Sequence, residues 1–464
     1  MGGVIMKLLG LTVQALYGCY DYNVTFNSDV TFIYGTNGCG KTTILNITEA
    51  IITGQLYKLF GYTFNAVELL YAAHSNPKDH KTISITRQAK DALSITFNNE
   101  LHTVERLTIR DEMRPSERNS REMNRQYFNQ YRFLILIKET FNYVYLPLNR
   151  SSVLYDYDDD NRFYMARSLS RNHIPLELDT DLGINTRDVT MIQIESLISA
   201  HYSRINATVA KISDDFRDEI LKSLLSVSRD YDFEHLFRGI IAQSTTVPDL
   251  QKTKNAYIRM LKELKIVSKA EENNYSEFFD EFINELKTYK KGKHEFNMDL
   301  LMKYQEISKI NVLVSAAEKT EQEKAEARKP VETFLNTMNE FVSNSEDGKR
   351  IQIDSTGTVF FVTKYSDKRI SIQHLSSGEK QLITFFANLI FSVKSDRSGI
   401  FVVDEPELSL HLSWQKIFVE KTLEINKNIQ LIFATHSPEI IGKHRDKMYR
   451  LEKKYSQSGG YADE

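Results

Sequence analysis

Cysteine is nearly absent from this sequence: of its 464 residues, only Cys19 and Cys39 are cysteines. Two cysteines cannot build the disulfide framework that stabilises small secreted domains. A reducing compartment suits such a chain best, so we predict a cytoplasmic location.

Long apolar runs are missing as well. No segment reaches the roughly 18 consecutive apolar residues that a membrane-spanning helix needs, so we predict no membrane span and no membrane partner. The segment from Met6 to Cys19 superficially resembles a lipoprotein signal. However, Thr12 and Gln14 break its apolar run, and a first strand followed by a turn explains it better.

The chain has no strong excess of either charge. Its 59 Lys+Arg against 62 Asp+Glu give a formal net charge of -3. This balance argues against a uniformly basic nucleic-acid coat, although a local basic patch stays open. The length predicts two or three domains with ample material for a core.

Glycine nearly disappears from the middle of the chain, where only Gly239 and Gly292 lie between 190 and 346. Charged helical patterns dominate there, with no sustained heptads, so we expect an inserted helical domain rather than a long coiled coil. We expect Pro330 to kink or restart a helix. The predicted division is 1–189 for the first part of a main domain, 190–346 for the helical insertion and 347–464 for the rest of the main domain.

Strand patterns dominate the two ends of the chain. We predict early strands over 30–34, 82–86, 92–97 and 103–109, buried strands over 133–137 and 143–146, and late strands over 350–353, 358–363, 369–372, 400–403 and 429–434. Helices are expected after Thr42 and around 414–424. The two ends should therefore fold together into one α/β core.

A glycine-rich loop follows the first β-branched run of this core. It fits the pattern Gly-x-x-x-x-Gly-Lys-[Ser/Thr] between a strand and a helix, which is the context that a phosphate-binding loop requires. Its backbone N–H groups and the next helix N-terminus suit phosphate oxygens. Lys41 should reach the β- and γ-phosphates of ATP, and Thr42 should bind Mg²⁺. The predicted nucleotide-binding residues here are Gly35, Thr36, Asn37, Gly38, Cys39, Gly40, Lys41, Thr42 and Thr43.

A second candidate site is the acid pair that ends the apolar run 400–403. Acids at the carboxyl end of a buried strand lie where α/β proteins bind ligands. Asp404 fits a Mg²⁺ ligand acting through water, and Glu405 fits the base that polarises an attacking water. A strand with an ordinary surface acid pair is the competing interpretation, and the nearby phosphate-loop pattern disfavours it.

The segment Leu375–Gln381 is a third motif, and it is similar to the signature of ABC-type ATPases. It departs from the common Leu-Ser-Gly-Gly-Gln pattern at its third and fifth positions. Ser376, Ser377 and Gly378 would meet the γ-phosphate held by a second copy of the chain. A plain helix cap is the alternative. His436, at the end of the last buried strand, takes the place of the switch histidine of that family.

Two further patterns stay weak. Asp156, Asp158 and Asp160 mimic the start of a calcium loop, but the later positions do not fit and a solvated acidic loop is favoured. The arginines between Arg114 and Arg132, interleaved with aromatic residues, would suit a nucleic-acid surface or equally a salt-bridged helix.

The order of these motifs resembles the RecF and overcoming-lysogenization-defect group of ATPases. The stretch between Lys41 and Ser376 is too long for a transporter subunit, and only 28 residues follow His436, too few for the Toprim nuclease domain of the latter group. A stand-alone ATPase with a helical insert most resembles the PtuA family of the Septu anti-phage system, which also has retron-associated versions.

This resemblance implies an α/β fold with an ABC-type P-loop ATPase head and a mainly helical insertion. It implies ATP and Mg²⁺ as ligands, a head-to-tail dimer or larger assembly, an HNH nuclease partner similar to PtuB, and a contact with DNA or another nucleic acid. The implied catalytic residues are Glu405 and His436. Two alternatives stay open: a DNA-repair ATPase similar to RecF, and a nucleotide-binding scaffold with little turnover.

Overall fold

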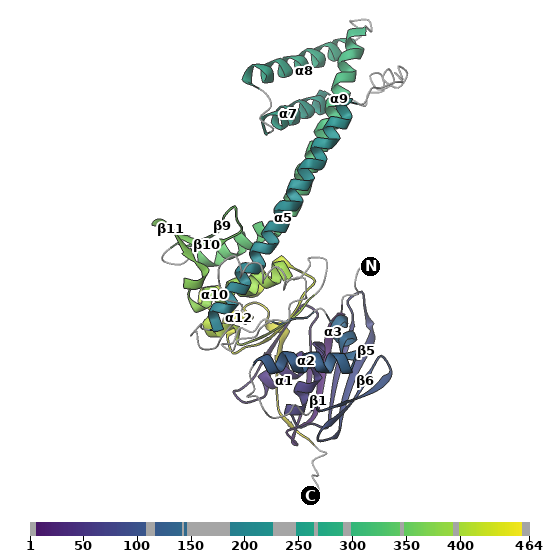
Figure 1. Ribbon diagram of the computed structural model, residues 1–464, viewed down its shortest axis with the longest axis vertical. Coiled ribbons are helices and arrows are strands. Elements are labelled where there is room, and N and C mark those ends of the chain that lie inside the picture. Colours follow the sequence, from purple (N-terminus) through teal and green to yellow (C-terminus); the bar gives the residue numbers. More distant parts are fainter. Residues whose placement is uncertain are drawn as a thin grey trace. The chain divides into compact units, whose positions relative to one another are not determined.

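The chain divides into two compact units in the computed structural model (Figure 1). The first unit combines Met1–Tyr202 with Pro330–Glu464, and the second is Ser203–Lys329. The structure describes residues 6–107, 117–141, 143–145, 186–225, 247–263, 268–290, 298–343, 348–392 and 399–456.

An antiparallel sheet built mostly from the first hundred residues forms one layer of the first unit. Its seven strands run in the order β15-β2-β1-β4-β5-β6-β7. Their bounds are β1 Met6–Leu16, β2 Tyr20–Thr25, β4 Ala66–Ala73, β5 Asn76–Ala89, β6 Ala92–Phe97, β7 Glu100–Glu105 and β15 Lys454–Tyr455. The early strands that we predicted within 82–109 are thus confirmed, with shifted ends.

A parallel sheet carries the motifs. Its order is β14-β3-β13-β12-β8, and every neighbouring pair is parallel. The strands are β3 Val30–Tyr34, β8 Tyr143–Tyr145, β12 Ile400–Asp404, β13 Gln430–Ala434 and β14 Met448–Arg450. Because β3 lies beside β13, and β13 beside β12, the two ends of the chain form one sheet and their motif-bearing loops meet at its carboxyl edge.

One hydrophobic core joins these two sheets. It includes Leu11 and Val67 from the antiparallel sheet, Ile432 from the parallel sheet, and Ile44 and Ile47 from helix α1 (Lys41–Ile52). Apolar residues at three- and four-residue spacing give α1 the buried face that makes it stable in this position.

A buried glutamine adds a polar link between the sheets. The Gln430 side chain accepts a hydrogen bond from the Leu8 amide at 2.8 Å and donates to the carbonyl oxygens of Leu8 and Asn27. These bonds satisfy a side chain that has no exposed surface, which otherwise would cost free energy. They tie residues from opposite ends of the chain into one unit.

The rest of the first unit is built from the last third of the chain. A small antiparallel sheet has the order β11-β10-β9, from Ser366–Ser371, Val359–Thr363 and Arg350–Ile353. The helices and short turns are η3 Ile372–His374, α10 Ser377–Ala387, η4 Asn388–Ser392, η5 Pro406–Ser409, α11 Leu412–Ile425, α12 Pro438–Ile441 and η6 Arg445–Lys447. The predicted late strands and the helix around 414–424 are confirmed.

One predicted strand is wrong. Residues 133–137 begin a helix, α3 (Phe133–Thr140), that buries Phe133, Leu134 and Ile137 and leaves Leu136 exposed. A short apolar run does not distinguish a buried strand from a buried helix, and here tertiary packing decides. The other predicted strand in this stretch, 143–146, is confirmed as β8, Tyr143–Tyr145.

The arginine-rich segment contains helix α2 (Glu117–Gln130). Its aromatic side chains face inward: Tyr127 is 1% exposed, its ring lies 5.2 Å from that of Tyr57 (η1, Leu56–Gly61), and its hydroxyl accepts a hydrogen bond from the Leu107 amide. Tyr127 is therefore a core residue and cannot stack on nucleic-acid bases. Arg114 and the acidic loop 156–160 lie outside the described residues.

The second unit is helical in its described part. Helices α7 (Val247–Glu263) and α8 (Lys269–Lys290) pack with parts of the long helices α5 (Thr186–Leu225) and α9 (Met298–Val342) around a core of their own. That core includes Phe216, Phe279, Phe282 and Ile310. It is separate from the core of the sheets.

The long helices α5 and α9 belong to both units. The boundaries of the second unit, 203 and 329, therefore fall inside helices, whereas the predicted insertion was 190–346. Helix α9 is assigned as one helix through Pro330 and does not restart there. None of the helices in the described ranges combines the length and the hydrophobicity that a bilayer crossing requires.

Candidate functional site

The glycine-rich loop follows β3 and leads into α1, as its sequence predicts. Gly38 and Gly40 have φ angles of 75° and 103°, which non-glycine residues rarely adopt. A Cβ atom at Gly40 would lie 2.8 Å from the Tyr22 hydroxyl oxygen, and that hydroxyl donates to the Cys39 carbonyl oxygen at 2.9 Å. Tyr22 was not predicted as a site residue, and it supports the loop through its hydrogen bond to Cys39.

Lys41 lies at the centre of the site and is 7% exposed. Its ammonium group is 3.1 Å from the Gly35 carbonyl oxygen, 3.4 Å from the Thr36 carbonyl oxygen and 2.7 Å from His436 Nε2. A lysine ammonium has three hydrogens and can only donate, so all three are engaged and His436 Nε2 acts as the acceptor. The structure thus brings together two predicted residues that lie 395 positions apart in the sequence.

Asp404 ends β12 beside this lysine. Its side chain is hydrogen-bonded to the Thr42 side chain, while its Oδ1 atom is buried and has no hydrogen-bond partner among the described residues. Burial raises the pKa of Asp404, the charges of Glu405 and Glu407 raise it further, and Thr42 and Lys41 act in the opposite direction. A buried carboxylate oxygen without a partner costs free energy, so this atom is poised for a cation.

Glu405 has an unusual backbone. Its φ and ψ are 48° and 57°, the left-handed region, and its amide donates to the Ala434 carbonyl oxygen at 2.8 Å. Non-glycine residues in this region cost of order 1 kcal/mol or more and cluster at functional sites. This conformation marks the turn between β12 and η5.

Glu407 in η5 holds the histidine turn, and the prediction of site residues missed it. Its carboxylate accepts from the Thr435 hydroxyl at 2.8 Å and from the His436 amide at 2.7 Å. Ser437 then donates to Gln415 Oε1 at 2.6 Å. The sequence signal was present, because Glu407 follows the acid pair by two residues, but only the fold shows what it contacts.

The signature segment forms the N-terminus of α10. Ser376 is the N-cap, and with Glu379 it makes a complete capping box. Ser376 and Ser377 are exposed, whereas Gly378 is buried. Helix α10 contacts η5, which carries Glu407. The amide and hydroxyl of Ser376 are hydrogen-bonded to Glu379, and its carbonyl oxygen accepts from the Lys380 amide at 2.9 Å.

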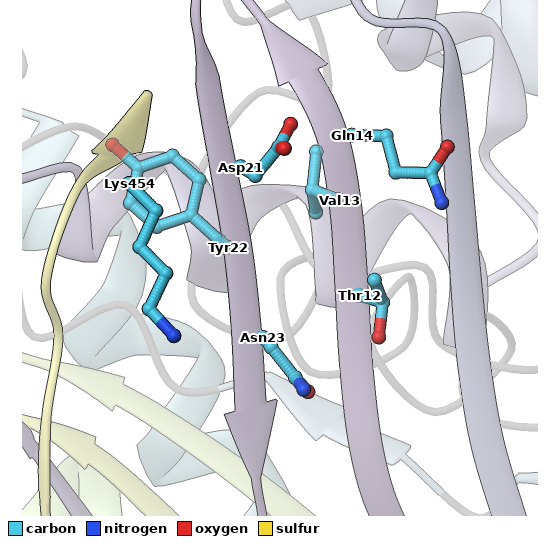
Figure 2. A pocket seen from close by; sticks show the side chains of 7 residues that line it. All are labelled: Thr12, Val13, Gln14, Asp21, Tyr22, Asn23 and Lys454. Carbon is cyan, nitrogen blue, oxygen red and sulfur yellow. The ribbon is translucent and has the colours of Figure 1, made fainter. Parts of the chain in front are cut away.

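A pocket of about 210 Å³ lies over strands β1, β2 and β15 (Figure 2). Its lining residues are Thr12, Val13, Gln14, Asp21, Tyr22, Asn23 and Lys454. None of them is a predicted site residue. Tyr22 connects the pocket to the phosphate loop through its bond to Cys39, and Asp21 is already engaged as an acceptor for the Ala15 amide at 2.7 Å.

Comparison with curated proteins finds two retron ATPases. Over 190 residues the chain is 28% identical to a retron Vc95 probable ATPase of Vibrio cholerae serotype O1 biovar El Tor, covering 36% of each protein. Over 80 residues it is 35% identical to a retron Ec83 probable ATPase of Escherichia coli, covering 15% of each. The chain matches about a third or less of the length of these relatives.

Among solved structures, one similar chain is the Smc head domain with an extended coiled coil, bound to the C-terminal domain of ScpA, from Pyrococcus furiosus. It covers 97% of this chain and 96% of its own, at 12% identity and a TM-score of 0.37. A likeness at this level carries no argument about function. The family model described as AAA ATPase domain, in contrast, matches residues 6–441, nearly the whole chain. This protein is therefore a member of the AAA ATPase domain family, with its ATPase head assembled from both ends of the chain.

Proposed function

We propose that this protein is the ATPase subunit of an anti-phage defence complex, in which ATP binding and hydrolysis between two head-to-tail copies regulate a separate HNH nuclease subunit. The observation that carries the nucleotide part is the contact of Lys41 with His436 beside the partnerless Asp404 oxygen. Names of the curated relatives, both retron ATPases, support the defence setting and favour a retron-associated version over a stand-alone Septu system.

In this proposal the phosphate loop binds the triphosphate. Loop amides between Gly35 and Gly40 point their N–H groups at phosphate oxygens, and the N-terminus of α1 adds its positive end. Lys41 exchanges its carbonyl and histidine acceptors for β- and γ-phosphate oxygens. His436, released from Lys41, then lies free to contact the γ-phosphate.

The acids of β12 complete the hydrolytic arrangement. Asp404 and Thr42 would hold Mg²⁺, since their oxygens are the ligand type this ion prefers and Asp404 Oδ1 has no other partner. When bound, Mg²⁺ neutralises charge on the phosphates. Glu405 accepts the proton of the attacking water. Glu407 fixes the turn that carries His436.

The second copy would supply Ser376, Ser377 and Gly378. The Ser377 and Gly378 amides lie in the first turn of an 11-residue helix, where backbone amides have no carbonyl partner within the helix. Such amides suit the γ-phosphate held by the first copy. The Ser376 amide, in contrast, is bonded to Glu379 Oε2. In the same proposal the nuclease subunit acts on DNA or another nucleic acid.

A purification experiment tests the division of labour. Co-expression with the proteins encoded by the neighbouring genes should yield a complex that contains an HNH protein and cleaves DNA, while the ATPase chain purified alone should hydrolyse ATP without cleaving DNA. Lys41→Met in the complex should change cleavage although the nuclease subunit is intact. Robust cleavage by the solitary chain would overturn the proposed division.

Loss of Glu407 should weaken the histidine turn. In Glu407→Ala the fully buried Thr435 hydroxyl and the His436 amide lose their acceptor, so we expect a loss of about 2 kcal/mol in the free energy of unfolding and a clearly lower ATP turnover. Urea unfolding and a phosphate-release assay measure the two effects. Glu439→Ala, which removes a 41% exposed partner of Lys416, is the control and should change neither. Unchanged turnover in Glu407→Ala would contradict this role.

A further inference from the structure

An ion pair with one buried partner adjoins the signature turn: Glu379 is buried, whereas the side chain of Lys349 is 21% exposed. Glu379, at the third position of α10, has a side chain that is only 4% exposed, and the Lys349 ammonium contacts its Oε1 atom at 2.9 Å. Lys349 is outside α10: it precedes β9 and lies 30 positions earlier in the chain. Removing one partner of such a pair leaves a buried charge uncompensated, which is far costlier than losing a surface pair.

The other oxygen of Glu379 is committed to Ser376. Oε2 accepts from the Ser376 amide at 2.9 Å and from the Ser376 hydroxyl at 2.8 Å, while the Glu379 amide donates back to Ser376 Oγ at 3.3 Å. The serine is therefore held by three hydrogen bonds to a single residue. Its orientation follows from the orientation of the Glu379 carboxylate.

Lys349 decides that orientation. With Oε1 paired to Lys349, Oε2 is the oxygen that faces Ser376. Burial alone acts to raise the pKa of Glu379, but the hydrogen bonds from Lys349 and Ser376 outweigh it and leave the pKa below its ordinary value. The carboxylate is thus kept charged, which makes it a strong acceptor for both Ser376 donors. An ordinary solvated capping box needs no such partner.

We propose that Lys349 is a positioning residue for the shared nucleotide site: through Glu379 it holds Ser376, so that the signature turn of one copy is preorganised to meet the phosphate bound by the other. This proposal rests on the head-to-tail site proposed above. In this proposal Lys349 acts on the nucleotide site only through Glu379 and Ser376. Lys349 of one copy therefore affects the hydrolysis of ATP bound to the phosphate loop of the other copy, and not of ATP bound to its own loop.

The direct test mixes two impaired variants. Lys349→Met keeps the phosphate loop intact and damages the signature, whereas Lys41→Met does the reverse. Lys349→Met alone should hydrolyse ATP about 10-fold more slowly than the wild type, with unchanged affinity for a fluorescent ATP analogue. In an equal mixture, mixed dimers contain one site with both halves intact, so the rate should rise to about a quarter of the wild-type rate.

The control mixture pairs Lys41→Met with Ser377→Arg, which blocks the exposed signature turn without touching the capping box. If this control recovers activity and the Lys349→Met mixture does not exceed the average of its components, Lys349 does not act through the signature and the inference is wrong. If neither mixture recovers ATP hydrolysis, the proposal of a nucleotide site shared between two copies is wrong, and so is the proposed function.

Two further variants distinguish a loss of positioning from simple misfolding. Lys349→Arg keeps the charge and should retain most of the wild-type turnover. Lys349→Met combined with Glu379→Gln removes both charges, and because the amide oxygen still accepts from Ser376, turnover should return to within about threefold of the wild type. A double variant no more active than Lys349→Met, with an unchanged melting temperature, would overturn the positioning role.

Discussion

Replacing Glu405 with glutamine should lower ATP turnover by about 100-fold or more, because general-base catalysis by a positioned carboxylate contributes rate factors of this size. Such a factor corresponds to about 2.7 kcal/mol of transition-state stabilisation. Glutamine preserves the size of the side chain and meets the left-handed backbone at position 405 no worse than glutamate. Nucleotide binding should therefore persist. ATP turnover and size-exclusion chromatography with ATP measure the two effects, and the dimer should accumulate.

Position 405 offers a second variant that separates strain from chemistry. Glu405→Gly removes the carboxylate and also the cost of a φ of 48°, so it should be equally inactive but more stable to unfolding. An exposed acid such as Glu452 provides the matched control, and Glu452→Gln should leave turnover unchanged. If Glu405→Gln turned over ATP normally, hydrolysis would not use this base; if defence were indifferent to a complete loss of turnover, ATP binding alone would be the function.

Replacing Lys41 with methionine should abolish the stabilisation of the protein by ATP. The wild type, at an ATP concentration of about 100 times Kd, should gain about 2.7 kcal/mol, seen as a higher melting temperature. Lys41→Met removes a cation that lies within hydrogen-bond distance of both the phosphate loop and His436, so we expect the affinity for ATP to fall by roughly 100-fold or more, about the loss of one strong charge-assisted contact.

A matched control keeps this experiment specific. Lys416→Met replaces a lysine that is 62% exposed and only weakly paired. ATP should raise the melting temperature of this variant as much as it raises that of the wild type. Repeating the titration with EDTA in place of Mg²⁺ should reduce the ATP effect in the wild type, since Asp404 Oδ1 then stays without a cation. An undiminished ATP shift in Lys41→Met would contradict the assignment of the phosphate loop.

Local patterns predicted much of this molecule. The loop from Gly35 to Thr42 needs left-handed glycines and a helix directly after it, and both features are written in consecutive residues. The buried strands that end at Asp404 and Ala434 contain continuous apolar runs, 400–403 and 431–434, which favour a parallel sheet covered on both faces. Their positions followed from residues close in sequence, so no tertiary information was needed.

Other elements could not be predicted in this way. The run from Phe133 to Ile137 is equally apolar as a strand or a helix, and packing against its neighbours made it a helix. Tyr127 lies in an arginine-rich segment that suggested a nucleic-acid surface, yet its ring is buried in the core. In both cases the deciding contacts come from residues distant in sequence.

The sequence by itself predicted a phosphate-binding loop between a strand and a helix, and two acids and a histidine at the ends of buried strands, because each of these signals is local. Only the tertiary structure decided that Lys41 contacts His436 and that Glu407 accepts hydrogen bonds from Thr435 and His436. It also decided that Lys349 pairs with Glu379, which in turn binds Ser376. The physical reason is that a hydrogen bond requires its atoms to lie within about 3 Å of each other, and for residues far apart in the chain only the packing of the sheets and helices around common cores sets that distance.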